Sequence, residues 1–118
     1  MATNFDTLEM LRAVEQMEKG NYSTAFELLV PLAEAGNPRA QINLATLYHF
    51  GLGVGVCGAR AIDLYRTVAE QNIPEGHLSA LACNNLATLF FTGLPGVERN
   101  PEEGQRYLAR ARDLGFEM

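Results

Sequence analysis

A glycine-rich turn carries the sequence pattern most often linked to cofactor chemistry. Gly53, Gly55 and Gly58 stand at the spacing G-x-G-x-x-G, which in dinucleotide-binding proteins lets the backbone approach a pyrophosphate at the start of a helix. That chemistry requires a preceding strand and a βαβ unit. The residues before this turn have helical periodicity, and the equivalent turn at 93–97 lacks the pattern. We therefore interpret it as a turn between helices and expect no cofactor.

Two cysteines and two histidines are the next candidates, because thiolate and imidazole groups bind metals. Cys57, Cys83, His49 and His77 show none of the spacings of a zinc site. Cys83 lies in an apolar helical segment, where a buried thiol behaves as a small hydrophobic group. We expect free thiols and no metal site, with a Cys57–Cys83 disulfide as the alternative.

Paired carboxylates could serve as a general acid and base. Glu102 and Glu103 open a helical segment, where negative charge complements the helix dipole. No Ser-His-Asp arrangement with a recognisable context accompanies them. We therefore expect no enzymatic activity and no catalytic residue. A carboxylate pair that the fold brings together is the enzymatic alternative.

The charge of the chain argues against two classes of partner. Its 118 residues carry a formal net charge of −5, and its pI is near 4.9. Lys19 and eight arginines are scattered, whereas nucleic-acid binding needs basic residues in clusters. We expect neither nucleic acid nor a membrane as a partner. No apolar run approaches the roughly 20 residues of a transmembrane helix, and no secretory signal is visible at the start, so we expect a cytoplasmic location.

An internal repeat shows how these residues are organised. Asn43-Leu44-Ala45-Thr46-Leu47 returns intact as residues 85–89, and each copy is followed by a bulky pair and a glycine turn. The segments that follow also align, at an offset of 36 residues between the first and second copies. Self-similarity at such a period is typical of stacked helical units rather than of one globular core.

Helix-type periodicity covers most of the chain, and no stretch alternates as a strand would. We predict an all-α domain over residues 1–118, an α-α superhelix or solenoid of about three antiparallel helical hairpins. Short loops force neighbouring helices into hairpins. The predicted helices run over residues 4–18, 22–35, 38–50, 58–71, 77–92 and 101–114.

The helix boundaries have specific stop and start signals. Gly20 and Gly36 are suited to the left-handed conformation that ends a helix. Asn21, Asn37 and Asn100 are predicted to cap the following helices, because an asparagine side chain accepts a hydrogen bond from an exposed backbone amide. In the first helix, a stripe of apolar residues is predicted to face the core: Phe5, Leu8, Leu11 and Val14.

The repeat resembles a known family. Residues 40–48, followed by Gly51-Leu52-Gly53-Val54, are similar to the first helix and loop of a Sel-one-like repeat, and residues 61–71 are similar to its second helix. Residues 20–36 resemble the lead-in common in bacterial members. The resemblance covers residues 20–116. It implies a tetratricopeptide-like α-solenoid that acts as an adaptor for assembling complexes.

Three departures from the family pattern stand out. Cys57 occupies a position where the family usually has a capping Asp. Gly104 replaces a close-packing alanine, which costs roughly 0.5–1 kcal/mol in a helix interior. Residues 73–78 lengthen one junction between repeats.

The solenoid interpretation predicts a binding groove. The first helix of each unit lines the concave side, and helical spacing then turns one set of residues toward the groove. Their mixture of apolar, aromatic and hydrogen-bonding groups is typical of peptide-binding grooves; packing against neighbouring helices is the alternative for Phe50 and Phe91. The predicted protein-binding residues are Arg39, Ile42, Thr46, His49, Phe50, Leu81, Asn84, Thr88 and Phe91.

We therefore expect a non-enzymatic adaptor for protein–protein interaction, with a peptide or protein segment as its partner. The alternative is a structural or self-assembling protein without a separate ligand. The turn at 51–58 is unusually apolar and is a second candidate surface, for instance for a homodimer. Burial against adjacent helices is the simpler interpretation for Leu52 and Val54.

Overall fold

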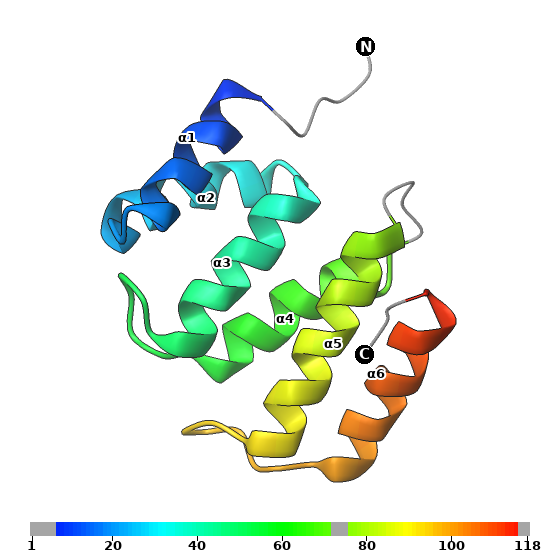
Figure 1. The fold of residues 1–118 in the computed structure, drawn as a ribbon. Coiled ribbons are helices and arrows are strands. Elements are labelled where there is room, and N and C mark those ends of the chain that lie inside the picture. The colour runs from blue at the N-terminus through cyan, green and yellow to red at the C-terminus, as the bar shows by residue number, and fades with distance from the viewer. Residues whose placement is uncertain (1–6, 72–75, 116–118) are drawn as a thin grey trace.

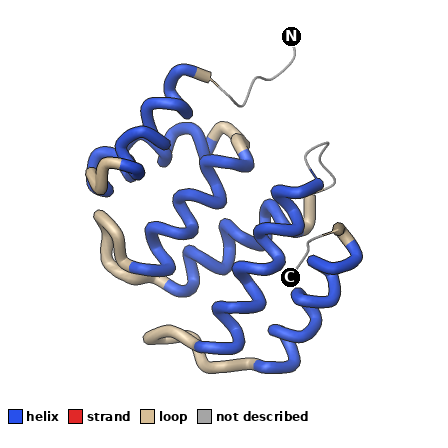
Figure 2. Tube along the Cα trace, viewed as in Figure 1, coloured by secondary structure: helices blue, strands red, loops and turns tan. Residues whose placement is uncertain are grey.

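The computed structural model describes residues 7–71 and 76–115. Figures 1 and 2 show helices joined by short turns, each packed against the next along the chain. In the described ranges the only extended pairing is an isolated bridge between Leu94 and Val97. The predicted all-α helical-repeat solenoid is confirmed. Its helices are α1 (Leu8–Glu18), α2 (Tyr22–Glu34), α3 (Pro38–Phe50), α4 (Gly58–Ala69), α5 (Gly76–Thr92) and α6 (Pro101–Asp113).

The predicted helix boundaries are mostly confirmed. Gly20 and Gly36 adopt φ values of +79° and +95°, the left-handed conformation that ends α1 and α2. The side chains of Asn37 and Asn100 accept hydrogen bonds from backbone amides in the first turns of α3 and α6. The prediction for Asn21 is wrong, because its side-chain amide donates to the Gln16 side chain instead and makes no capping bond.

The turn between α3 and α4 packs tightly onto α2. A Cβ atom on Gly53 would collide with the backbone of Tyr22 and Ser23, so only glycine permits this approach. Leu52 and Val54 are partly buried in the core, which is the packing we expected for them. Helix α3 precedes the turn, so the G-x-G-x-x-G spacing here belongs to a turn between helices.

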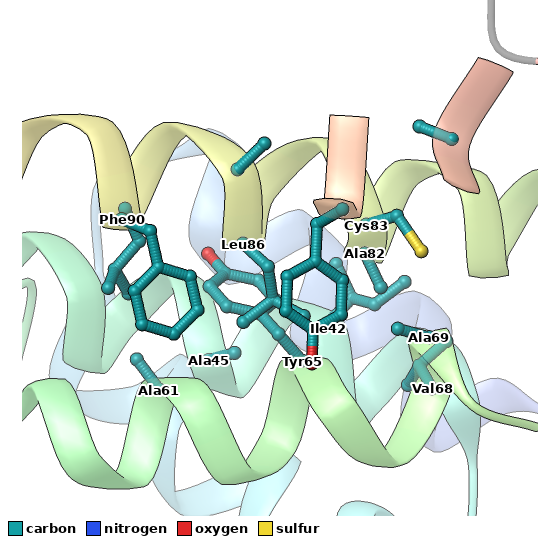
Figure 3. Close-up of a cluster of buried hydrophobic side chains, with 14 of the residues drawn as sticks. Ile42, Ala45, Ala61, Tyr65, Val68, Ala69, Ala82, Cys83, Leu86 and Phe90 are labelled. Carbon is teal, nitrogen blue, oxygen red and sulfur yellow. The ribbon is translucent and has the colours of Figure 1, made fainter. Parts of the chain in front are cut away.

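Two hydrophobic clusters form the core. The first joins α1, α2 and α3, and the second joins α3, α4, α5 and α6. Helix α3 faces both, with Leu44 and Leu47 in the first cluster and Ile42 and Ala45 in the second. Figure 3 shows Ile42 and Ala45 meeting Tyr65 of α4 and side chains of α5.

Helix α1 buries only part of the predicted face: Val14 packs against the first cluster as predicted, but Leu8 and Leu11 do not. Met10 and Ala13 are buried, whereas Leu8 and Leu11 are 59% and 57% exposed; Phe5 lies outside the described residues. The sequence of α1 has apolar residues at helical spacing on both sides, so periodicity alone did not identify the packed side. The structure leaves an apolar pair on the outside of the helix.

Two of the departures from the family pattern have a visible structural context. A Cβ on Gly104 would lie 2.9 Å from the ring of Phe91, so the absence of a side chain lets α5 and α6 approach. The predicted insertion at 73–78 lies partly outside the described residues; its last three residues form the start of α5, which has 17 residues against 13 in α3.

Candidate protein-binding face

The first helices of successive units lie on one side of the stack. Helix α3 contacts α5 directly, whereas the second helices α2, α4 and α6 do not pack closely on one another. In Figure 1, α3 and α5 run in the same direction. Helices α3 and α5 are therefore in contact on this side. We call the surface that α1, α3 and α5 form the inner face.

A small hollow marks the inner face. Its volume is about 130 Å³, and residues from α1, α3 and α5 line it. Because these helices belong to three different units, the hollow exists only when the units are stacked. The lining residues are Met10, Val14, Arg39, Ile42, Asn43, Leu78 and Leu81.

On α3, one stripe of residues continues from the hollow along the inner face. Arg39 and Asn43 line the hollow, and Thr46 and Phe50 follow seven and eleven positions after Arg39, on the same side of the helix. Phe50 is 59% exposed. Arg39, Thr46 and Phe50, which were predicted to face the groove, thus share one side of α3, where Arg39 and Thr46 are half-buried.

Helix α5 presents a matching stripe. Leu81 lines the hollow and is 36% exposed, and Thr88 lies two turns further along the same side of the helix. Asn84, between them, is half-buried. The hydroxyl group of Thr88 donates to the Asn84 carbonyl oxygen, and that of Thr46 donates to the Ile42 carbonyl. The exposed Thr88 therefore offers a partner a methyl group and an acceptor oxygen, whereas the hydroxyl of Thr46 also lies 3.3 Å from that of Tyr65.

Charge is almost absent from these two stripes. None of the chain's 14 acidic residues lies in α3 or α5, and Arg39 is the only lysine or arginine in either helix. Helices α4 and α6 carry charges of both signs instead, and α2 carries only the acidic Glu27 and Glu34. The α3 and α5 part of the inner face is thus nearly uncharged, whereas α1 carries charged residues of both signs.

Ile42 and His49 do not lie open on this face as predicted. Ile42 is only 4% exposed and belongs to the second cluster, although it forms part of the floor of the hollow. The helical register is the reason, since both residues lie beside Ala45, which faces the core. In this conformation neither side chain is open to a partner along its length.

His49 takes part in a buried polar contact. It is 5% exposed, its Nδ1 atom lies 3.3 Å from the hydroxyl oxygen of Tyr65, and the Phe50 ring stacks on it at 4.2 Å between centroids. The Thr46 hydroxyl lies 3.3 Å from the same Tyr65 oxygen. Burial lowers the pKa of His49, because it disfavours the charged imidazolium.

Phe91 packs between helices, which was the alternative for this residue. Its ring lies against Gly104 of α6, and its carbonyl oxygen accepts a hydrogen bond from Arg99. It therefore lies toward the junction between α5 and α6, away from the centre of the inner face. Of the two candidate aromatic residues, only Phe50 remains prominently exposed.

Asn43 belongs to the inner face although it was not among the predicted residues. It is half-buried and lines the hollow. The signal was present in the sequence, because Asn43 lies four positions after Arg39 and three before Thr46. Its repeat in the next unit, Asn85, is half-buried as well.

The remaining reactive groups of the described residues have structural surroundings. Cys57 and Cys83 are free thiols, and burial raises the pKa of Cys83, which disfavours the nucleophilic thiolate. Glu103 forms ion pairs with Arg66 and Arg106. Within the described ranges no group of three or more His, Cys, Asp or Glu residues could hold a metal ion. No helix in that part of the chain is long and apolar enough to cross a membrane.

The geometry of repeated hairpins agrees with a comparison of the sequence with protein families. A family model of the Sel1 repeat matches residues 14–37, 38–73 and 80–116. The chain belongs to the Sel1 repeat family. The three matches correspond to the hairpins α1–α2, α3–α4 and α5–α6, which confirms the resemblance seen in the sequence. Comparison with curated proteins finds no match to the chain. Sel1 repeats are generally non-catalytic repeats that mediate protein–protein interactions.

Proposed function

We propose that this Sel1-repeat chain is a non-enzymatic adaptor that binds a peptide or protein segment on its inner face. The observation that carries the proposal is the pair of partly apolar stripes on α3 and α5, in which Arg39 is the only charged residue. The stripes begin at the hollow, and the one on α3 ends at Phe50. A surface with apolar groups among a few hydrogen-bonding ones is the usual composition of a recognition site.

The lining residues suggest how such a segment would bind. Leu81 and Val14 flank the hollow, which has room for an apolar side chain of the partner. Asn43 adds an amide that both donates and accepts hydrogen bonds. Phe50 lies at the other end of the face and offers a ring of which 59% is exposed. A partner that contacts both ends must lie along the helices.

The test compares matched variants of the two faces. A partner is isolated from the source organism on the immobilised chain, identified, and then measured with purified proteins by calorimetry. Phe50→Ala together with Leu81→Ser should weaken binding by about tenfold or more, because exposed apolar anchors carry most of the energy of an interface. Val56→Ser together with Leu114→Ser removes apolar groups that are also exposed but lie elsewhere, and should leave the affinity unchanged. Equal affinities of the two double variants would refute the proposal.

Self-association is the second candidate function, and one observation favours it. Leu8 and Leu11 form an exposed apolar pair on α1, and such a pair can support contact with a second copy. Light scattering over a concentration series tests this candidate. A dimer that Leu8→Ser and Leu11→Ser dissociate would support it, whereas a monomer at every concentration would exclude it.

A further inference from the structure

The outer side of the stack contains two equivalent creases. The first lies between α2 and α4 above α3, and the second lies between α4 and α6 above α5. Their residues correspond at offsets of 36, 42 and 43 positions for the three helix pairs. Val30, Tyr48 and Leu64 in the first crease therefore correspond to Arg66, Phe90 and Tyr107 in the second.

An arginine of the chain lies on the floor of the second crease, and a hollow of about 440 Å³ stays open beside it between α4 and α6. The Nε atom of Arg66 donates a hydrogen bond to the Tyr107 hydroxyl oxygen at 3.0 Å. Its guanidinium carbon lies 5.7 Å from the centre of the Phe90 ring, and Nη2 lies 3.6 Å from Oε1 of Glu103. Arg66 thus contacts a hydroxyl group, an aromatic ring and a carboxylate at one site. This combination suits arginine, whose planar cation can stack on a ring and pair with a carboxylate.

The first crease lacks an arginine at this position. The shorter Val30 stands in place of Arg66, Leu64 stands in place of Tyr107, and Arg60 stands in place of Glu103. A hollow of about 270 Å³ is left open, with an apolar floor and charged residues at its rim. Its lining residues are Val30, Ala33, Glu34, Leu44, Tyr48, Arg60, Asp63 and Leu64.

The rim of the first crease is acidic. Glu34 and Asp63 are both exposed, and neither forms an ion pair within 4.0 Å in the ranges that the structure describes. The guanidinium of Arg60 lies over the Tyr48 ring, 5.9 Å from its centre. Two carboxylates face one arginine, so the rim has a net negative charge that can accept one more cation.

We propose that the first outer crease binds an arginine side chain of a partner protein. The stem of that arginine lies on Val30 and Leu64, and its guanidinium pairs with the carboxylates of Glu34 and Asp63. The place of the stem on the crease floor matches that of Arg66, but the carboxylates come from the rim at Glu34 and Asp63, because Arg60 stands where the second crease has Glu103. A guanidinium suits the site better than an ammonium, because it is planar and pairs with a carboxylate through two parallel hydrogen bonds.

This site is separate from the inner face. Leu44 and Tyr48 line the crease from the side of α3 that lies away from Asn43 and Phe50. A partner could therefore contact both surfaces or only one. A variant that loses binding at the inner face keeps the first outer crease intact, and the reverse also holds. The proposed peptide site and the proposed arginine site can therefore be refuted independently.

The experiment is a titration of the full chain followed by amide NMR shifts at constant ionic strength. The probe is N-acetyl-arginine methylamide, and the control is the citrulline analogue, which has nearly the same shape without the charge. The arginine probe should shift residues 30–34 and 60–64 in a saturable way, and citrulline should not. Equal shifts from both probes, or no shifts from the arginine probe, would overturn the proposal.

Two variants assign the effect to the crease. Glu34→Gln together with Asp63→Asn should weaken probe binding by about fivefold or more, because charge-assisted pairs are lost. Val30→Arg should abolish binding of the arginine probe, because the new side chain would itself occupy the first crease. The circular dichroism of this variant should remain that of the folded chain. Phe50→Ala together with Leu81→Ser should bind the probe unchanged. Undiminished binding by the Glu34 and Asp63 variant would show that the probe lies elsewhere.

Discussion

The ring of Phe91 occupies the space into which any side chain at position 104 would project, since a Cβ atom on Gly104 would lie 2.9 Å from the ring. Glycine in a helix normally costs about 0.5–1 kcal/mol relative to alanine. In α6 that cost is offset by the close approach of α5. The glycine thus has a packing reason that lies 13 positions away in the sequence.

Gly104→Ala should therefore destabilise the protein despite its better helix propensity. Overpacking of this kind costs about 1–3 kcal/mol, and urea unfolding measures it. In a Phe91→Ala background the same change should become stabilising by up to about 1 kcal/mol. Additive effects of the two substitutions would contradict the role assigned to the ring.

Cys57→Asn should stabilise the protein by about 1 kcal/mol. Cys57 begins α4 with φ −143° and ψ 96°, and makes no side-chain capping bond. Asn100 begins α6 with nearly the same backbone, φ −141° and ψ 84°, and its side chain accepts from the amide of Glu103. An asparagine at position 57 can accept from the amide of Arg60 in the same way. Cys57→Ala is the control. Equal midpoint temperatures of thermal unfolding for the two variants would refute the capping argument.

Arg110→Ala should cost about 1–3 kcal/mol of stability, because it leaves a buried backbone acceptor without its partner. The Nε and Nη2 atoms of Arg110 donate to the Ala69 carbonyl oxygen at 3.2 and 3.1 Å, at the end of α4. Arg112→Ala is the matched control, since Arg112 is exposed and its side chain makes no hydrogen bond or ion pair among the described residues. Equal urea midpoints for the two variants would show that the contact adds nothing.

Stability should decline as the pH falls through the ordinary histidine pKa of about 6.5. Burial lowers the pKa of His49 in the folded chain, so between the two pKa values the unfolded chain binds more protons. The stabilisation that the neutral His49 contributes is therefore fully present above the histidine pKa of the unfolded chain, and it is lost as the pH falls below that pKa. His49→Gln should flatten the pH dependence of the free energy of unfolding between about pH 7.5 and 5.5. His77→Gln, which removes the exposed histidine, should retain it; the reverse result would contradict this assignment.

The sequence predicted the fold well because its strongest signals are local. Gly20 and Gly36 end helices, Asn37 and Asn100 begin them, and the repeated pentapeptide sets the register of α3 and α5. Each of these signals depends on backbone geometry within a few residues. They needed no knowledge of the packing between helices.

The candidate site was less predictable, because exposure depends on that packing. The sequence placed Arg39, Thr46 and Leu81 on the sides of α3 and α5 that form the inner face. It could not show that Tyr65, from another helix, draws His49 inward. Nor could it show that Phe91 turns toward a glycine that leaves room for it. Both differences arise from contacts between residues more than ten positions apart.

The sharing of α3 between the two cores has a consequence for how the chain unfolds. Leu47 and Ala45 lie on opposite cores, and Tyr48 and Leu64 contact both. Removing the first hairpin would therefore expose one flank of α3 to water and weaken the helix on which the second core is built. Truncation between two repeats should therefore also lower the stability of the repeat that remains, because both cores unfold cooperatively with the helix that they share. The sequence divides into three separate hairpins. Hydrogen exchange should instead show cooperatively unfolding groups of residues that both include α3.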